Sequence, residues 1–221
     1  MGTVSTRRSL AAGLALLLAL TGCVNPFSPA TPEAPNVGGV VPNFSTPEKV
    51  LDTIAEAISA EGGGELAYSD ALADSASSTT PFGFYATPDP VALAAWRQAS
   101  PGRDPYETGD VRHERLFFPE LMTVLDGFDY VFAWTTDTHS ENDDINNTAG
   151  TALLHRRYFL QASSTDGRIV EIIAVGYADL FLRKYGGRWY LARWDDRIDP
   201  DYGVNPTNLY NRSLGWRRLD L

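Results

Sequence analysis

The stretch "RIVEIIAVGYADLFLRKYGGRWYLARWDDRID", from Arg168 to Asp199, is the densest apolar and aromatic run outside the N-terminal segment. Gly186 and Gly187 stand in its middle, and glycine readily takes the positive φ that a two-residue hairpin turn needs. The pattern therefore predicts a long antiparallel β-hairpin with these two glycines at its tip. In the register that this turn sets, Leu182 lies opposite Leu191.

This register predicts two different faces for the hairpin. One face is a nearly plain packing surface that holds Gly176, Ala178, Leu180 opposite Arg193, Leu182 and Leu191. The other face pairs Phe181 with Ala192, Asp179 with Trp194 and Tyr177 with Asp196. Both faces are substantially apolar and need cover, and the helices before the hairpin can cover only one. We expect the C-terminal tail, a partner subunit or a ligand to cover the rest.

The N-terminus has the pattern of an exported lipoprotein. A polar segment ends in Arg7 and Arg8, an apolar run extends from Ser9 to Leu20, and "LTGC" follows, ending at Cys23. This resembles a bacterial lipoprotein signal peptide with its lipobox, whose cysteine thiol receives the lipid. Cys23 is the only cysteine, so no intramolecular disulfide can form. The alternative is a plain secretory signal followed by an incidental cysteine.

These features predict the location and the domain organisation. The apolar run is too short for a comfortable transmembrane helix, so we expect a lipid-anchored protein of the cell envelope. Val24 after the cysteine permits transfer to the outer membrane, facing the periplasm, if the source is a diderm bacterium. Otherwise the anchor lies in the outer face of the cytoplasmic membrane. We expect a signal peptide over 1–22, a proline-rich disordered tether over 23–45, and one domain over 46–221.

The charge balance excludes one class of partner. The chain carries 28 acidic against 18 basic residues, and its formal net charge is −10. A surface this acidic argues against binding to nucleic acid. Solubility explains it more simply than a site for a cationic ligand does.

Helical patterns dominate the first half of the domain. Thr46 as N-cap and Pro47 predict a helix start. A second short helix is expected from Glu65 to about Ala73, and a short strand around Phe82 to Ala86. Asp89 or Pro90 then opens another helix. The stretch from Pro105 to Met122 is expected to be partly helical and irregular, interrupted by Gly109 and Pro119.

Alternating patterns follow. Phe128, Tyr130, Phe132 and Trp134 fall on one face of a predicted strand. The polar segment from Asp137 to Thr148 is rich in oxygen ligands but lacks the spacing of an EF-hand loop, so we interpret it as a solvated loop. The next strand extends from about Thr151 to Ala162, with His155 and Arg157 on one face.

The order of these elements resembles a known superfamily. The pattern is similar to nuclear transport factor 2-like, or SnoaL-like, domains. It consists of two N-terminal helices, a short strand, a further helix and long antiparallel strands that end in "GRWYLARWDD". The resemblance covers about Thr46 to Ile198. It rests on the segment "ELAYSDALADS" followed by "FGFY", and on the pattern of Gly187, Trp189, Leu191 and Trp194 in the closing strand. It implies an α+β cone: a strongly bent antiparallel sheet wrapped around N-terminal helices, with a pocket and often a dimer across the sheet.

The superfamily contains both enzymes and non-catalytic modules, so the fold alone does not show whether this protein is an enzyme. Isomerase chemistry needs a carboxylate base and an oxyanion donor in an apolar cavity. The candidates are Asp179, His155 and Tyr130. For Asp179 the simpler interpretation is an edge or solvent-facing carboxylate or a partner of Arg183 or Arg157. For His155 it is a surface charge network. The residues expected to line a pocket or interface are Tyr177, Asp179, Phe181, Trp194 and Trp134.

Other chemistry has no support in the sequence. We find no glycine-rich phosphate loop, no Cys and His at zinc spacing and no nucleophile elbow, so neither a metal nor a cofactor is predicted. The sequence favours a non-enzymatic module that binds a small apolar ligand or assembles with proteins. The alternatives are a small-molecule enzyme of ketosteroid-isomerase or cyclase type that uses Asp179 or His155, and a structural homodimer formed through the sheet.

Overall fold

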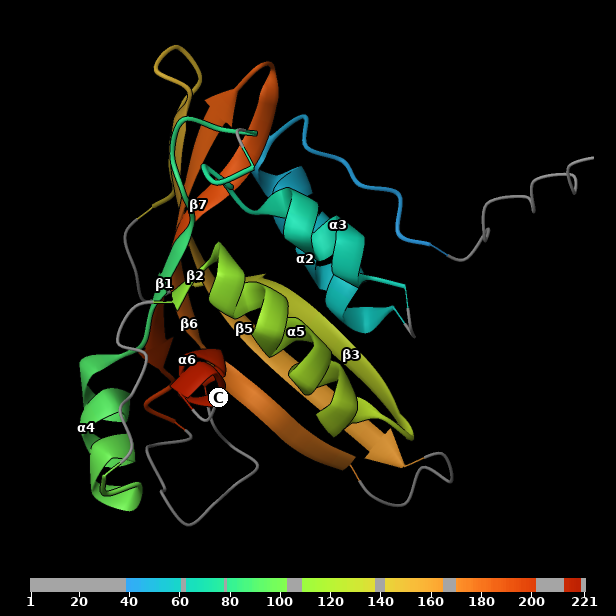
Figure 1. Cartoon of the computed structure of the whole chain (residues 1–221), viewed down its shortest axis with the longest axis vertical. Coiled ribbons are helices and arrows are strands. Elements are labelled where there is room, and N and C mark those ends of the chain that lie inside the picture. Colours follow the sequence, from blue (N-terminus) through green and yellow to red (C-terminus); the bar gives the residue numbers. More distant parts are fainter. Residues whose placement is uncertain are drawn as a thin grey trace, which may run out of the picture. The chain divides into compact units, whose positions relative to one another are not determined.

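Helices pack on one face of a seven-stranded sheet (Figure 1). The computed structural model describes residues 39–60, 63–77, 79–102, 109–137, 142–164, 170–201 and 213–219. The expected signal peptide, Cys23, most of the expected tether and the start of the predicted hairpin lie outside the described residues. Among the described residues, no helix is both long and apolar enough to cross a membrane.

The helices are α2 (Pro47–Ser59), α3 (Glu65–Ala71), α4 (Pro90–Ala99), α5 (Val111–Leu125) and α6 (Leu214–Leu219). The strands are β1 (Tyr85–Thr87), β2 (Gly109–Asp110), β3 (Phe128–Thr136), β4 (Asp144–Asn146), β5 (Thr151–Ser164), β6 (Val170–Tyr185) and β7 (Arg188–Ile198). The sheet order is β2-β1-β7-β6-β5-β3, with β4 beside β5. The pairings are antiparallel except that of β1 with β7.

The predicted helix starts are confirmed. The Thr46 side chain accepts a hydrogen bond from the Lys49 amide at the start of α2, and the Asp89 carboxylate caps α4. The expectation of an irregular segment around Pro119 was wrong, because α5 continues through this proline. Asp110 caps α5 in a capping box, and Phe117 and Phe118 are buried on its inner side. This packing outweighs the backbone hydrogen bond that the proline cannot form.

The hairpin turn is confirmed, and the predicted register holds only near it. Gly186 and Gly187 have φ of 58° and 86°, and Leu182 lies opposite Leu191. A bulge then leaves Ala192 of β7 without an opposed residue, so Leu180 faces Trp194. A shift of one residue exchanges the two faces of a strand.

The bulge overturns the predicted pairs beyond Leu182. Leu180 does not oppose Arg193, and the pairs Phe181 with Ala192, Asp179 with Trp194 and Tyr177 with Asp196 do not form. Trp194 therefore leaves the face of Tyr177 and Asp179 and is fully buried on the face of Leu180. We call the side of the sheet that holds Leu180 and Trp194 the helix face, and the side that holds Tyr177 and Asp179 the opposite face.

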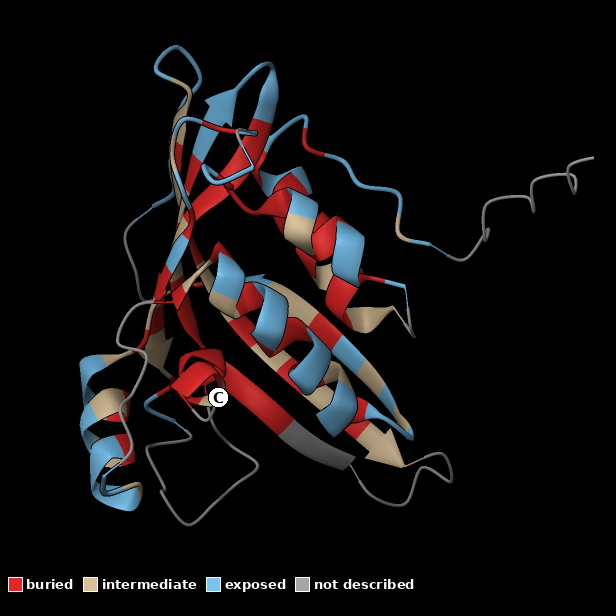
Figure 2. Cartoon of the chain, in the orientation of Figure 1, coloured by how far each residue is buried: buried red, intermediate tan, exposed pale blue. Residues whose placement is uncertain are grey.

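The core lies between the helix face and the helices, whose inner sides are buried (Figure 2). The aromatic stripe of β3 belongs to it: Phe132 is buried, and Phe128, Tyr130 and Trp134 pack against it. The C-terminal α6 also lies on the helix face, where the Leu214 amide donates a hydrogen bond to the Tyr158 hydroxyl. The tail thus shares one face with α2, α3 and α5, whereas α4 packs against α6 in a separate apolar cluster that includes Trp96 and Trp216.

The packed part of the chain begins before Thr46, where the sequence predicted a disordered tether. Phe44 exposes only 7% of its surface. Its carbonyl accepts a hydrogen bond from the Trp189 amide at 2.9 Å, and the Arg188 guanidinium lies 4.4 Å from the centroid of its ring. The end of the predicted tether is therefore part of the domain.

We expect Phe44→Ala to lower the free energy of unfolding by about 3 kcal/mol, because it removes a buried aromatic side chain and leaves a cavity. Chemical denaturation monitored by tryptophan fluorescence would measure the change. Val41→Ala is the matched control, since Val41 is 82% exposed and its truncation should change stability little. Equal stability of the Phe44 variant and the wild type would contradict the placement of Phe44 in the core.

Candidate functional site

Five elements bring polar side chains together at the end of the helix face that α6 covers. α3 supplies Tyr68, α5 supplies Glu114, β5 supplies Tyr158, β7 supplies Asp196 and α6 supplies Arg218. All five side chains are buried. Buried polar and charged groups are unfavourable unless they are paired, so this cluster is a candidate functional site.

Glu114 and Arg218 form a buried ion pair. The Arg218 Nε donates to Glu114 Oε1 at 2.5 Å, and Nη2 donates to Oε2 at 3.2 Å. The Tyr68 hydroxyl also donates to Oε2, at 2.5 Å. Burial raises the pKa of Tyr68 well above its usual value, and the Glu114 charge adds to this. Burial alone would lower the pKa of Arg218, but the Glu114 carboxylate raises it. Arg218 is therefore a cation held at a fixed place.

Tyr158 and Asp196 form a second pair beside the first. The Tyr158 hydroxyl donates to Asp196 Oδ1 at 2.5 Å, and the amide of Gly215 donates to Oδ2 at 3.1 Å. Burial raises the pKa of Asp196 to about 6, although hydrogen bonds from Ser213 and Tyr158 act in the other direction. Burial likewise raises the pKa of Tyr158, and the Asp196 charge adds to the rise. The site thus holds a carboxyl group that titrates near neutral pH.

Two glycines allow these close approaches. A Cβ on Gly215 would lie 2.6 Å from Asp196 Oδ2, and one on Gly176 would lie 2.5 Å from the Tyr158 hydroxyl. Either contact is too short for a real side chain. The "SLGWRRL" segment, residues 213–219, therefore fits against β7 because the second residue of α6 is glycine.

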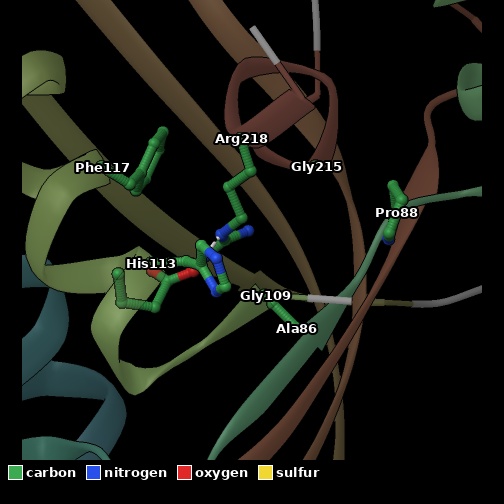
Figure 3. A pocket seen from close by; sticks show the side chains of 8 residues that line it. Ala86, Pro88, Gly109, His113, Phe117, Gly215 and Arg218 are labelled. Carbon is green, nitrogen blue, oxygen red and sulfur yellow. Dashed lines mark hydrogen bonds and ion pairs between the residues drawn. The ribbon is translucent and has the colours of Figure 1, made fainter. Parts of the chain in front are cut away.

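The space that remains beside α6 is small. A cavity of about 10 Å³ lies among α5, α6 and the β1 region, and Figure 3 shows Arg218 reaching from α6 toward His113 and Phe117 of α5. This volume holds about one water molecule. In the described part of the chain, Arg218 Nη1 and Trp194 Nε1 are buried without a hydrogen-bond partner. The space between α6 and α5 is therefore nearly filled, and these two donors have no partner among the described residues.

Two sequence-predicted candidates meet on the opposite face. His155 Nδ1 lies 2.6 Å from Asp179 Oδ1, and Nη2 of Arg197 donates a hydrogen bond to the same oxygen at 2.8 Å. Arg197 also reaches Asp137, at 3.3 Å. The bulge creates this arrangement, because it places Arg197 opposite Tyr177. Asp179 is thus an ion-pair partner, although the arginine is neither Arg183 nor Arg157.

The other predicted residues are divided between the two faces. Tyr177 and Phe181 lie on the opposite face with Asp179, where Arg157 and Arg197 flank the Tyr177 ring at 5.8 Å and 5.9 Å. Trp134 and Trp194 lie on the helix face, with ring centroids 5.1 Å apart. Tyr130 is also on the helix face, and its hydroxyl donates to the Ala60 carbonyl at 3.4 Å. The structure therefore does not combine Tyr130 with Asp179 in one site.

Sequence reasoning missed Glu114, Asp196 and Arg218. Asp196 was assigned to the wrong face because a bulge has no signature in the alternating pattern of β7. Glu114 and Arg218 are 104 residues apart, so no local spacing relates them. Two features of the sequence could have indicated the pair. Glu114 is an acidic residue among the apolar positions of a helical segment, and Arg218 lies in a tail that combines basic and apolar residues. Within the described ranges, no cluster of three or more His, Cys, Asp or Glu side chains could hold a metal ion.

No protein-family model and no curated protein matches the chain. Solved structures are similar in fold. A variant of Rv3472, a protein of unknown function from Mycobacterium tuberculosis, is 11% identical over 73% of this chain and 77% of that chain, with a TM-score of 0.47. A protein described as a scytalone dehydratase from Novosphingobium aromaticivorans is 12% identical over 76% and 90%, with a TM-score of 0.43.

A Streptomyces avermitilis protein described as a dehydratase from the NTF2-like family is 13% identical over 66% of this chain and 88% of that chain, with a TM-score of 0.40. These likenesses concern the fold alone. The mixed α+β fold with a bent sheet, which the resemblance to nuclear transport factor 2-like domains implied, is confirmed by the arrangement of the helices and strands (Figure 1).

The raised pKa of Asp196 predicts a pH-dependent stability. The pKa is about 6 in the folded chain and near its usual 3.8 in the unfolded chain. The protonated group's contribution is therefore complete only below the unfolded pKa of 3.8 and is lost as the pH rises from there through about 6. Relative to Asp196→Asn, the wild type should lose about 2 kcal/mol of unfolding free energy between pH 4 and pH 7.

Urea denaturation of both proteins across this pH range would measure the difference. Asp195→Asn is the control, because Asp195 is the neighbouring carboxylate on the opposite face and 36% of its side chain is exposed. A difference between wild type and Asp196→Asn that stays constant with pH would show that Asp196 does not titrate in this range.

Proposed function

We propose that this protein is a lipid-anchored extracytoplasmic domain that acts by binding rather than by catalysis. The observation that carries the proposal is the occupied helix face. Amides of α6 bind Tyr158 and Asp196, and Arg218 binds Glu114. The recess between the sheet and α5 already holds a peptide segment, which happens to belong to the same chain. A recess of this kind is suited to recognise peptide.

The arrangement of the sequence-predicted candidates also supports binding. A base must lie within hydrogen-bond reach of its substrate, with an oxyanion donor nearby. His155 and Asp179 contact each other and Arg197, whereas Tyr130 lies on the other side of the sheet. The predicted catalytic set is therefore divided, and the ion pairs of the opposite face have an evident structural role.

The lipid anchor rests on the "LTGC" sequence that ends at Cys23. We infer a cell-envelope protein that is attached through this cysteine and held off the membrane by the proline-rich segment. A domain fixed at a membrane surface is well placed to bind other envelope components. The acidic composition is consistent with a partner that carries positive charge.

When the full chain is expressed in a bacterium, we expect it to incorporate labelled palmitate and to sediment with membranes. Cys23→Ser should abolish the label and move the protein to the soluble fraction, because it lacks the thiol that carries the lipid. Val24→Ala keeps the thiol and should behave like the wild type. Undiminished labelling of Cys23→Ser would refute the anchor.

One observation favours a second function, a small-molecule enzyme of isomerase or cyclase type. Asp196 is a buried carboxyl group with a pKa of about 6, and it lies 2.5 Å from the Tyr158 hydroxyl. A base and an oxyanion donor in an apolar site have this composition. Aromatic rings of Trp134 and Trp194 surround the pair. In this version Asp196 replaces Asp179 as the base, and α6 must move to admit a substrate.

A turnover assay separates the two functions. We expect no isomerisation of a β,γ-unsaturated ketone, measured by the absorbance of the conjugated product, because α6 fills the space beside Asp196 and leaves no room for a substrate. A measured rate that Asp196→Asn abolishes and Asp179→Asn preserves would establish the second function. A rate that Asp179→Asn abolishes would instead restore the residue first predicted from the sequence.

A further inference from the structure

The Arg218 guanidinium occupies a recognition site built entirely from other elements. Its Nε and Nη2 bind the two oxygens of Glu114, a two-point contact that matches the planar fork of arginine. Its Cζ lies 4.5 Å from the centroid of the Trp194 ring and 5.0 Å from that of Phe117. Cations within about 6 Å of an aromatic centroid are attracted by the ring.

The carboxylate in this site is held in place independently of Arg218. The Tyr68 hydroxyl, on α3, donates to Glu114 Oε2 at 2.5 Å. Glu114 lies in the first turn of α5, which the Asp110 capping box fixes. Trp194 packs against Trp134 and Tyr158 at centroid distances of 5.1 Å and 5.9 Å. The receptor side therefore keeps its anchoring contacts in the absence of α6.

The fit of Arg218 in this site is incomplete. Its Nη1 is buried without a hydrogen-bond partner in the described part of the chain. Arg218 also lines the cavity of about 10 Å³ beside α5. A buried donor needs an acceptor, and this cavity has room for about one water molecule or for one polar group of a partner. An arginine that approaches from another protein can bring an acceptor with it.

We infer that Glu114, Trp194 and Phe117 form a guanidinium-recognition site, that Arg218 fills it as an intramolecular ligand, and that an arginine of a partner protein competes with α6 for it. The inference rests on the proposed binding function and names its ligand. Lysine is a poorer ligand, because an ammonium group cannot make the two-point contact with the carboxylate. The acidic chain, with a net charge of −10, attracts cationic segments to the site.

The first experiment tests recognition in the full-length chain by chemical rescue. Arg218→Ala removes two methylene groups and the guanidinium, which together correspond to N-ethylguanidinium. We expect millimolar N-ethylguanidinium to raise the Tm of this variant saturably by about 3 °C and to leave wild type unchanged. n-Butylammonium, a cation of similar size, should have a much smaller effect. The double variant Glu114→Gln, Arg218→Ala should not respond.

Three results of the rescue would overturn the site: no saturable rise, an equal rise with n-butylammonium, or a rise that persists in the double variant. If Arg218→Ala is unfolded alone, far-UV circular dichroism replaces Tm, and N-ethylguanidinium should restore the native spectrum. No response in either measurement counts against the site.

The second experiment tests competition in trans. A labelled synthetic peptide with the sequence of residues 213–221, "SLGWRRLDL", is titrated with full-length Arg218→Ala, and fluorescence anisotropy reports binding. We expect the peptide to bind at least about tenfold more tightly than the same peptide with lysine in place of Arg218, and to bind wild type more weakly than the variant. Equal binding of the two peptides would refute recognition of the guanidinium. This result would not overturn the proposed binding function. The turnover assay tests that function separately, because it does not involve Arg218.

Discussion

A single unpaired residue in β7, Ala192, determines which side chains of the last strand face the helices. Successive residues of a strand point to opposite faces, so one extra residue reverses every later position. Without it, Trp194 and Asp196 would join Asp179 on the opposite face. With it, Trp194 packs among the aromatic rings of the core, and Arg197 reaches Asp179. Both faces of the sheet depend on this bulge.

The helix face contains a group of buried charges that are paired with one another. Desolvating a carboxylate or a guanidinium is costly, and removing one partner of a buried pair leaves an uncompensated charge. Glu114, Arg218 and Tyr68 compensate one another, and the amides of α6 satisfy Tyr158 and Asp196. The short C-terminal helix is held by these polar contacts together with its buried apolar side chains Leu214, Trp216 and Leu219. The polar contacts are directional, and a segment with the same groups can form them.

The opposite face illustrates how a plausible catalytic pair can have a structural role. His155 and Asp179 are 24 residues apart in the sequence and lie opposite each other on β5 and β6. Arg197 shares the Asp179 oxygen and also reaches Asp137. Tyr177 lies between Arg157 and Arg197. Each charge on this part of the face has a partner of opposite sign, which is the pattern of an ion-pair network along a sheet.

The sequence by itself determined the features that depend on neighbouring residues. The tip at Gly186 and Gly187 follows from the φ that glycine permits, the helix starts follow from Thr46 and Asp89, and the β3 stripe follows from strict alternation. Only the tertiary structure decided the position of the bulge, the burial of Asp196 and the pairing of Glu114 with Arg218. These features depend on packing between segments far apart in the chain, where local periodicity carries no information. The candidate site belongs to this second group, because its chemistry arises from the desolvation that only the assembled core provides.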